Sequence, residues 1–113
     1  MRSRSNLAAA RRFHAPVFAA LGDETRLSLV GKLCEHSPQS ISELTQGSSL
    51  TRQAISKHLR VLQHAGLVDS VRVGRESRYE FRPKPIDGIK DYLDHVSGQW
   101  DEALGRLKSL VER

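Results

Sequence analysis

The segment 47–67 contains polar side chains that repeat at the spacing of one helix face. At 100° per residue, Gln53, Lys57, Arg60 and His64 fall on the same side, at intervals of four, three and four residues. Glutamine can pair with the edge of adenine through two hydrogen bonds, and lysine or arginine can donate to the edge of guanine. A helix with this face could therefore bind in the major groove of DNA.

Different roles are expected for the individual side chains of this helix. Gln53 and Lys57 are expected to carry most of the base contact, and the Ser56 hydroxyl can bond to any base edge. His58 lies toward the opposite, packed side, so we expect it to bond to the protein or to a phosphate. The remaining expected phosphate contacts are Thr51, Arg52 and Arg60. An ordinary solvent-exposed helix face is the alternative explanation of these residue types.

The pattern after this helix predicts a β-hairpin over residues 68–82. Apolar and charged residues alternate on both sides of a turn predicted at 74–77. The hairpin would act as a wing whose candidate DNA contacts are Arg72, Arg75 and Arg78. Arg75 is nearest the tip, where an arginine can enter a narrow minor groove. An exposed arginine that only improves solubility is the alternative for Arg75.

Two short helices are predicted around a turn at residues 47–49. The second covers residues 51–65, with Thr51 as its N-cap and Gly66 as its terminator. Its apolar side carries Ile55, Leu59 and Leu62. The first carries Ile41 and Leu44, and either Ser40 or Ser42 can cap it. Two short helices across a glycine-containing turn form a helix-turn-helix.

The N-terminal part predicts two further helices. Residues 1–6 show no periodicity and are expected to form a flexible basic tail, and the first helix covers residues 7–21. Asp23 can cap the second, which is expected to run to about His36, before Pro38. Its predicted inward residues are Leu27, Val30, Leu33 and Cys34, so Cys34 is expected to be a buried, inert thiol.

A long terminal helix is predicted over residues 86–112, because apolar residues recur at intervals of three and four. This stripe needs a partner surface, and pairing with the first helix and with a second copy would bury it. The predicted dimer contacts are Phe13, Val17, Ile89, Leu93, Val96, Trp100, Leu104 and Leu107. A groove for another protein and the lining of a small-ligand pocket are the alternatives.

Composition limits the remaining possibilities. The chain has 113 residues, which suits one domain over residues 7–113, and a net charge of +5. The segment 51–82 holds seven basic and three acidic residues, which favours a polyanionic partner. No apolar run is long enough to span a membrane, and the single Cys34 suits a reducing cytoplasm. Side chains for a catalytic triad, a carboxylate pair or a phosphate-binding loop are not found, so no enzyme is expected.

Four sequence strings in this order resemble the ArsR family of bacterial winged-helix transcriptional repressors. They are FAALGDETRL (18–27), SKHLRVL (56–62), AGLV (65–68) and GRESRY (74–79). The resemblance spans about residues 13–82. It implies a dimer whose recognition helices enter successive major grooves of an inverted-repeat operator, usually overlapping a promoter.

The chain departs from this family at the positions where members sense metals or thiol oxidation. Ser40 and Ser42 stand where metal-sensing members often carry a Cys-x-Cys pair, and serine is a poor ligand for thiophilic metals. Asp94 and His95 do not reproduce the family's carboxylate and histidine site on the terminal helix. His14 and His95 could approach each other across the dimer, but two histidines make a poor metal site. No metal and no cofactor are therefore expected, and an unidentified small-molecule or protein effector is left open.

Together these patterns predict a mostly α-helical fold with a small β-hairpin wing. This winged helix-turn-helix would dimerise through its first and terminal helices. The expected function is sequence-specific binding to double-stranded DNA by a dimeric transcriptional repressor. The alternative is a winged-helix module that binds other proteins without reading DNA.

Overall fold

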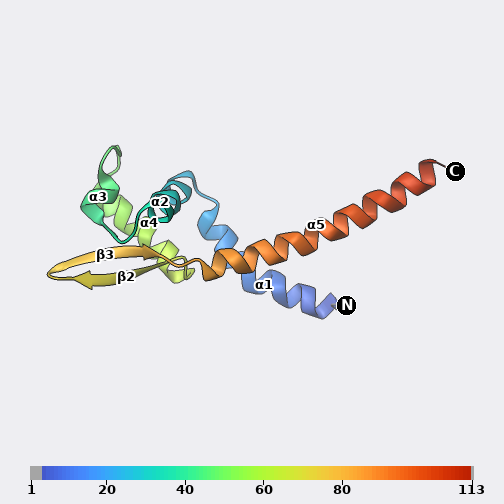
Figure 1. The fold of residues 1–113 in the computed structure, drawn as a ribbon, viewed down its shortest axis with the longest axis horizontal. Coiled ribbons are helices and arrows are strands. Elements are labelled where there is room, and N and C mark those ends of the chain that lie inside the picture. The colour runs from blue at the N-terminus through green and yellow to red at the C-terminus, as the bar shows by residue number, and fades with distance from the viewer. Residues whose placement is uncertain (1–3, 113) are drawn as a thin grey trace.

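The computed structural model describes residues 4–112, with side chains from Asn6 onward, and shows a mostly helical chain with a small antiparallel sheet. Helix α5 projects far beyond the other elements, so that the molecule measures 67 × 27 × 20 Å (Figure 1). The elements are α1 (Arg4–Leu21), α2 (Glu24–Glu35), β1 (Gln39–Ser40), α3 (Ile41–Thr45), α4 (Arg52–His64), β2 (Val68–Val73), β3 (Glu76–Phe81) and α5 (Lys84–Val111). The predicted fold class, a helix-turn-helix followed by a wing, is confirmed.

The N-terminus differs from the prediction of a flexible tail over residues 1–6. Helix α1 begins at Arg4, because Ser5 and Asn6 continue the helix that the alanine-rich segment after them favours. Residues 1–3 and 113 lie outside the described residues. The terminal helix begins two residues before the predicted start at residue 86, where Pro85 occupies the first turn and needs no helical N–H partner.

The caps of α2 and α4 are those that the sequence predicts. The Asp23 carboxylate accepts a hydrogen bond from the Arg26 N–H at 3.0 Å, and Thr51 Oγ1 accepts from the Ala54 N–H at 3.1 Å. Each contact satisfies one of the free N–H groups of a first helical turn. Gly66 follows α4 with a φ of +78°, a conformation that glycine adopts without a steric penalty.

Of the two predicted caps for α3, Ser40 is the one that the structure uses. Ser40 Oγ accepts from the Glu43 N–H at 3.2 Å, and Glu43 Oε1 in turn accepts from the Ser40 N–H at 3.4 Å. This reciprocal pair is a capping box. Ser40 is only 3% exposed, whereas Ser42 is exposed and accepts a hydrogen bond from Arg52.

The wing is part of a three-stranded sheet in the order β1-β3-β2. Strand β1 was not predicted, because two residues are too few to show an alternating pattern; it pairs with Arg78 and Tyr79 of β3. The turn between β2 and β3 is only two residues long, Gly74 and Arg75, because the next two residues already pair with β2. Gly74 has a φ of +64°, as such tight hairpin turns require. The predicted four-residue turn was therefore too long.

The core lies where α2, α3, α4 and the base of the sheet meet. Ile55, Leu59 and Leu62 of α4 are at most 1% exposed, which confirms the predicted inward face of this helix. The other buried apolar residues are Val17, Ala20, Leu29, Val30, Leu33, Leu44, Leu67, Val68 and Ile89. Burial of the apolar face of α4 leaves its polar face to solvent.

The predicted inward face of α2 was wrong at two of its four positions. Leu27 is 54% exposed and Cys34 is exposed, so Cys34 is not a buried thiol. The buried residues are Leu29, Val30 and Leu33. Leu27 and Cys34 share one side of the helix, about 100° from the centre of this buried stripe. Both sets of residues have helical spacing, and only tertiary packing decides between them.

We expect Ser40→Ala to lower the free energy of unfolding by about 1–2 kcal/mol, because it removes a buried cap and leaves the Glu43 N–H without its acceptor. Ser42→Ala is the matched control, since Ser42 is exposed and lies just inside the helix. Urea denaturation of both variants measures the effect. Equal stability of the two variants would contradict the assigned cap.

Candidate nucleic-acid interface

The four polar side chains predicted on one face of α4 are all exposed. Gln53, Lys57, Arg60 and His64 point away from the core, and Ser56 is half-buried at the edge of the same face. Among the described contacts, none of the four carries a side-chain hydrogen bond or ion pair to the protein, so their donors and acceptors are available to a ligand. The arrangement is a rigid, well-packed helix with a free polar side.

The first turn of α4 is held in place by its own polar residues. The Thr51 hydroxyl oxygen accepts the capping hydrogen bond, so its O–H remains available to donate to a phosphate. Arg52 is exposed and donates from Nη2 to Ser42 Oγ of α3. This contact joins the start of α4 to α3, and the other N–H groups of the exposed guanidinium have no partner among the described contacts.

His58 faces the protein rather than the exposed side of α4. Its Nδ1 lies 3.2 Å from Arg26 Nη1, and Arg26 Nε donates to the Ala20 carbonyl oxygen at 2.6 Å. Asp23 Oδ2 lies 3.8 Å from the same His58 nitrogen. Because a guanidinium can only donate, the contact with Arg26 makes His58 Nδ1 the acceptor. His58 thus accepts a hydrogen bond from the protein, which is one of the two roles expected for it, and we do not keep it among the proposed DNA contacts.

The Asp23, Arg26 and His58 cluster joins three helices at the N-terminal end of α2. The Arg26 backbone N–H that donates to this carboxyl, together with the charge of the Arg26 guanidinium, lowers the pKa of the Asp23 carboxyl below its ordinary value. Arg26 connects the end of α1 with α4 through a single side chain. Sequence reasoning recognised Asp23 as a cap but missed Arg26 as a bridge, because its partners are set by tertiary packing.

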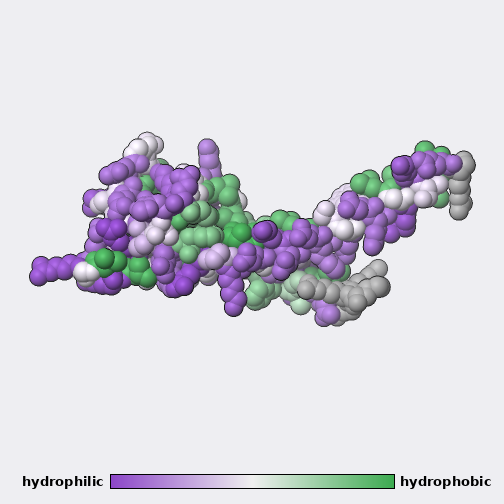
Figure 2. Space-filling model, viewed as in Figure 1, coloured by the Kyte–Doolittle hydropathy of each residue, from purple (hydrophilic) through white to green (hydrophobic). Residues whose placement is uncertain are grey.

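The wing arginines do not share one environment. Arg72 and Arg75 are exposed, and within the described part of the chain neither has an ion-pair partner. Arg75 occupies the two-residue turn at the tip, where hydrophilic side chains extend beyond the rest of the molecule (Figure 2). Both arginines are therefore available to a phosphate backbone.

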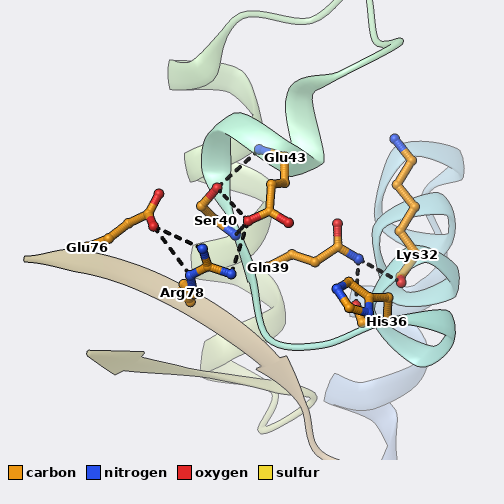
Figure 3. Close-up of polar contacts among 7 residues, drawn as sticks. All are labelled: Lys32, His36, Gln39, Ser40, Glu43, Glu76 and Arg78. Carbon is orange, nitrogen blue, oxygen red and sulfur yellow. Dashed lines mark hydrogen bonds and ion pairs between the residues drawn. The ribbon is translucent and has the colours of Figure 1, made fainter. Parts of the chain in front are cut away.

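Arg78 is instead paired inside the protein. Its Nη1 lies 3.1 Å from Glu43 Oε1 on α3, and its Nη2 lies 3.2 Å from Glu76 Oε2 on β3 (Figure 3). Glu43 is also the capping partner of Ser40. Arg78 thus ties the wing to the helix-turn-helix, and with its charge already paired we remove it from the candidate DNA contacts.

A second polar contact fixes the segment that enters α3. Gln39 Nε2 donates to the carbonyl oxygens of Lys32, at 3.0 Å, and of His36 (Figure 3). Both carbonyl groups belong to the C-terminal end of α2 and its cap, where the Lys32 carbonyl oxygen also accepts from the His36 N–H at 3.0 Å. Together with the Arg78 pairs, this contact holds α2, α3 and the sheet at fixed relative positions.

The predicted dimer contacts separate into buried and exposed residues. Val17 and Ile89 are 8% and 6% exposed within one chain, where they join the core between α1 and α5, so we remove them from the predicted interface. Val96 is half-buried. The exposed members are Phe13, Leu93, Trp100, Leu104 and Leu107, of which Trp100 is 64% exposed.

The two histidines weighed as metal ligands lie in different environments. His14 packs against the Tyr92 ring, with centroids 5.5 Å apart, and His95 is exposed. No group of three or more potential metal ligands occurs among the described residues. In the same residues, no helix combines the length and the apolar character needed to cross a bilayer.

Comparisons with known proteins agree with this geometry. The family described as helix-turn-helix domain matches residues 21–71. The uncharacterized HTH-type transcriptional regulator YuzN of Bacillus subtilis is 40% identical over 79 residues, covering 65% of this chain and 86% of that protein. The arsenical resistance operon repressor of the same organism is 29% identical over 72 residues, covering 64% and 69%.

A solved structure shares the whole architecture. The ArsR-like transcriptional regulator from Rhodococcus sp. RHA1 superposes with a TM-score of 0.79 at 39% sequence identity, covering 90% of this chain and 95% of that chain. The similarity extends beyond the helix-turn-helix to the wing and to parts of the flanking helices, since nine tenths of this chain lies within the match. The chain belongs to the ArsR family of DNA-binding, winged helix-turn-helix transcriptional regulators.

Proposed function

We propose that this regulator is a dimeric repressor that reads an inverted-repeat operator with α4 and the wing. The observation that carries the proposal is the pairing of a buried apolar face with a free polar face on α4. Gln53 and Lys57 would contact bases, with Ser56 beside them, and Thr51, Arg52 and Arg60 would bind phosphates. Arg72 and Arg75 would add contacts from the wing.

The dimer is supported by the exposed side of α5. From Leu93 onward, apolar residues continue at intervals of three and four along a helix that extends beyond the body of the protein (Figure 1). An exposed tryptophan and three exposed leucines on one stripe are unusual for a monomer surface. Pairing of two copies through this stripe and Phe13 would cover it and would present two recognition helices to one operator.

The assignment as a repressor, rather than an activator, rests on the relative named as the arsenical resistance operon repressor. A repressor of this kind would act by occupying a promoter.

We propose no catalytic activity, since regulators of this family act by binding. The proposed place of action is the cytoplasm. A gel shift with genomic fragments tests the sequence-specific DNA binding directly.

A DNA fragment that the wild-type protein enriches from a random pool serves as the target. We expect Gln53→Ala and Lys57→Ala each to weaken binding to this enriched fragment roughly tenfold or more, because each removes a base contact. Lys90→Ala is the control for lost positive charge, since Lys90 is exposed on α5. Fluorescence anisotropy on the enriched fragment and on a scrambled fragment measures affinity and discrimination. Wild-type discrimination in both variants would exclude these two residues as base contacts.

We expect Arg75→Ala to lower DNA affinity and to reduce the slope of log affinity against log salt concentration by about 1, because one phosphate contact is lost. Arg106→Ala, an exposed arginine on the projecting part of α5, should leave the slope unchanged. Titrations at several salt concentrations give both slopes. Identical slopes for Arg75→Ala and the wild type would make Arg75 a solubilising residue only.

We expect the wild-type protein to sediment as a dimer at micromolar concentration and Leu107→Ser to shift it toward the monomer. Leu107 is 57% exposed in one chain, so its replacement should not unfold the protomer. Ser109→Ala, two residues away, is the control. Sedimentation velocity measures the species present. A monomeric wild-type protein would overturn the proposed seam.

A further inference from the structure

A large open cleft lies where the recognition helix, the wing and the two flanking helices meet. Its volume is about 1030 Å³, at the upper end of the range of small-molecule sites. The apolar part of its wall comes from α1, from the end of α4, from the start of β2, and from the first turn of α5 with the residue before it. The residues that form this apolar wall are Phe13, Pro16, Val17, Ala65, Val68, Pro83 and Pro85.

The wall contains the junction between α4 and α5. Gly66, which ends α4, lies so close to Pro85 that a Cβ on the glycine would be 3.6 Å from Pro85 Cγ. On the other side, His14 of α1 lies over Gly88 of α5, where a Cβ would be 3.1 Å from His14 Cε1. An occupant of the cleft would therefore touch the end of α4 and the contact between α1 and α5 together.

The charges around the cleft are not balanced. Asp69 is paired with Arg82, with 3.1 Å between Oδ2 and Nη2. Asp87 and Asp91, one turn apart on α5, are exposed, and neither side chain has a partner among the described contacts. Lys84 supplies one positive charge at the same rim. The unpaired groups thus leave an excess negative charge beside an apolar wall, a combination that suits an organic cation with an apolar body.

We propose that this cleft is an effector site for a small organic cation with an apolar body. The apolar wall would bury the body, and Asp87 and Asp91 would attract the charge. Binding there couples to DNA because the occupant contacts the last turn of α4, the base of the wing and the helices of the proposed dimer. The coupling rests on the proposed function, whereas occupation of the cleft does not.

The first part of the test measures binding without DNA. Isothermal titration with tetraphenylphosphonium, an apolar monocation, should show saturable binding to the full chain. Tetraphenylborate has the same shape and the opposite charge, so it should bind at least about tenfold more weakly. The double variant Asp87→Asn/Asp91→Asn should lose roughly tenfold in affinity for the cation. The matched variant Asp94→Asn/Asp101→Asn, with two exposed carboxylates of α5 outside the cleft, should bind it like the wild type.

The second part measures the affinity for the enriched DNA fragment with and without saturating tetraphenylphosphonium. The wild type and Asp94→Asn/Asp101→Asn should change affinity, and Asp87→Asn/Asp91→Asn should not. Absence of cation binding, equal binding of the borate, equal affinities of the two double variants, or an unchanged DNA affinity would each overturn the effector site. A tighter or weaker dimer in Asp87→Asn/Asp91→Asn without cation binding would assign the cleft to the second copy instead. If the protein enriches no DNA sequence, the proposed function fails, but the titration without DNA still decides whether the cleft binds the cation.

Discussion

Burial of one face of α4 is the constraint on which the rest of the structure depends. Ile55, Leu59 and Leu62 are almost completely removed from solvent, and each such side chain contributes about 1.5–3 kcal/mol relative to an exposed one. Their spacing fixes the rotation of the helix, because turning it would expose all three at once. The same rotation sends Gln53, Lys57 and Arg60 outward. The polar face that we propose to read DNA is therefore a direct consequence of core packing.

Polar contacts then fix the neighbours of α4. Arg26 links the end of α1 to His58 on α4, and Arg78 links β3 to Glu43 on α3. Neither contact needs to contribute much stability, since partly exposed ion pairs contribute little. Their effect is geometric: the recognition helix, the helix before it and the wing are held as one unit. A unit of this kind can dock on DNA without reordering its parts, which limits the entropic cost of binding.

How far the sequence predicts this structure differs from element to element. Helix α4 could be predicted because its period, its Thr51 cap and its Gly66 terminator all agree. The buried side of α2 could not be predicted, because Leu27 and Cys34 lie three and four residues from Val30, which is the spacing that core residues of a helix also have. The roles of Arg78 and His58 depend on Glu43 and Arg26, which are distant in the sequence, so only the fold reveals them. The DNA-contact residues themselves remain predictions.

In the proposed dimer, two copies of α4 read a two-fold symmetric DNA sequence. Selection of binding fragments from a random double-stranded pool by the wild-type protein, followed by sequencing, tests this symmetry. We expect an enriched inverted repeat whose half-sites lie about one helical turn, or a multiple of it, apart. Enrichment of no sequence by the folded protein, or of a motif without internal symmetry, would contradict it.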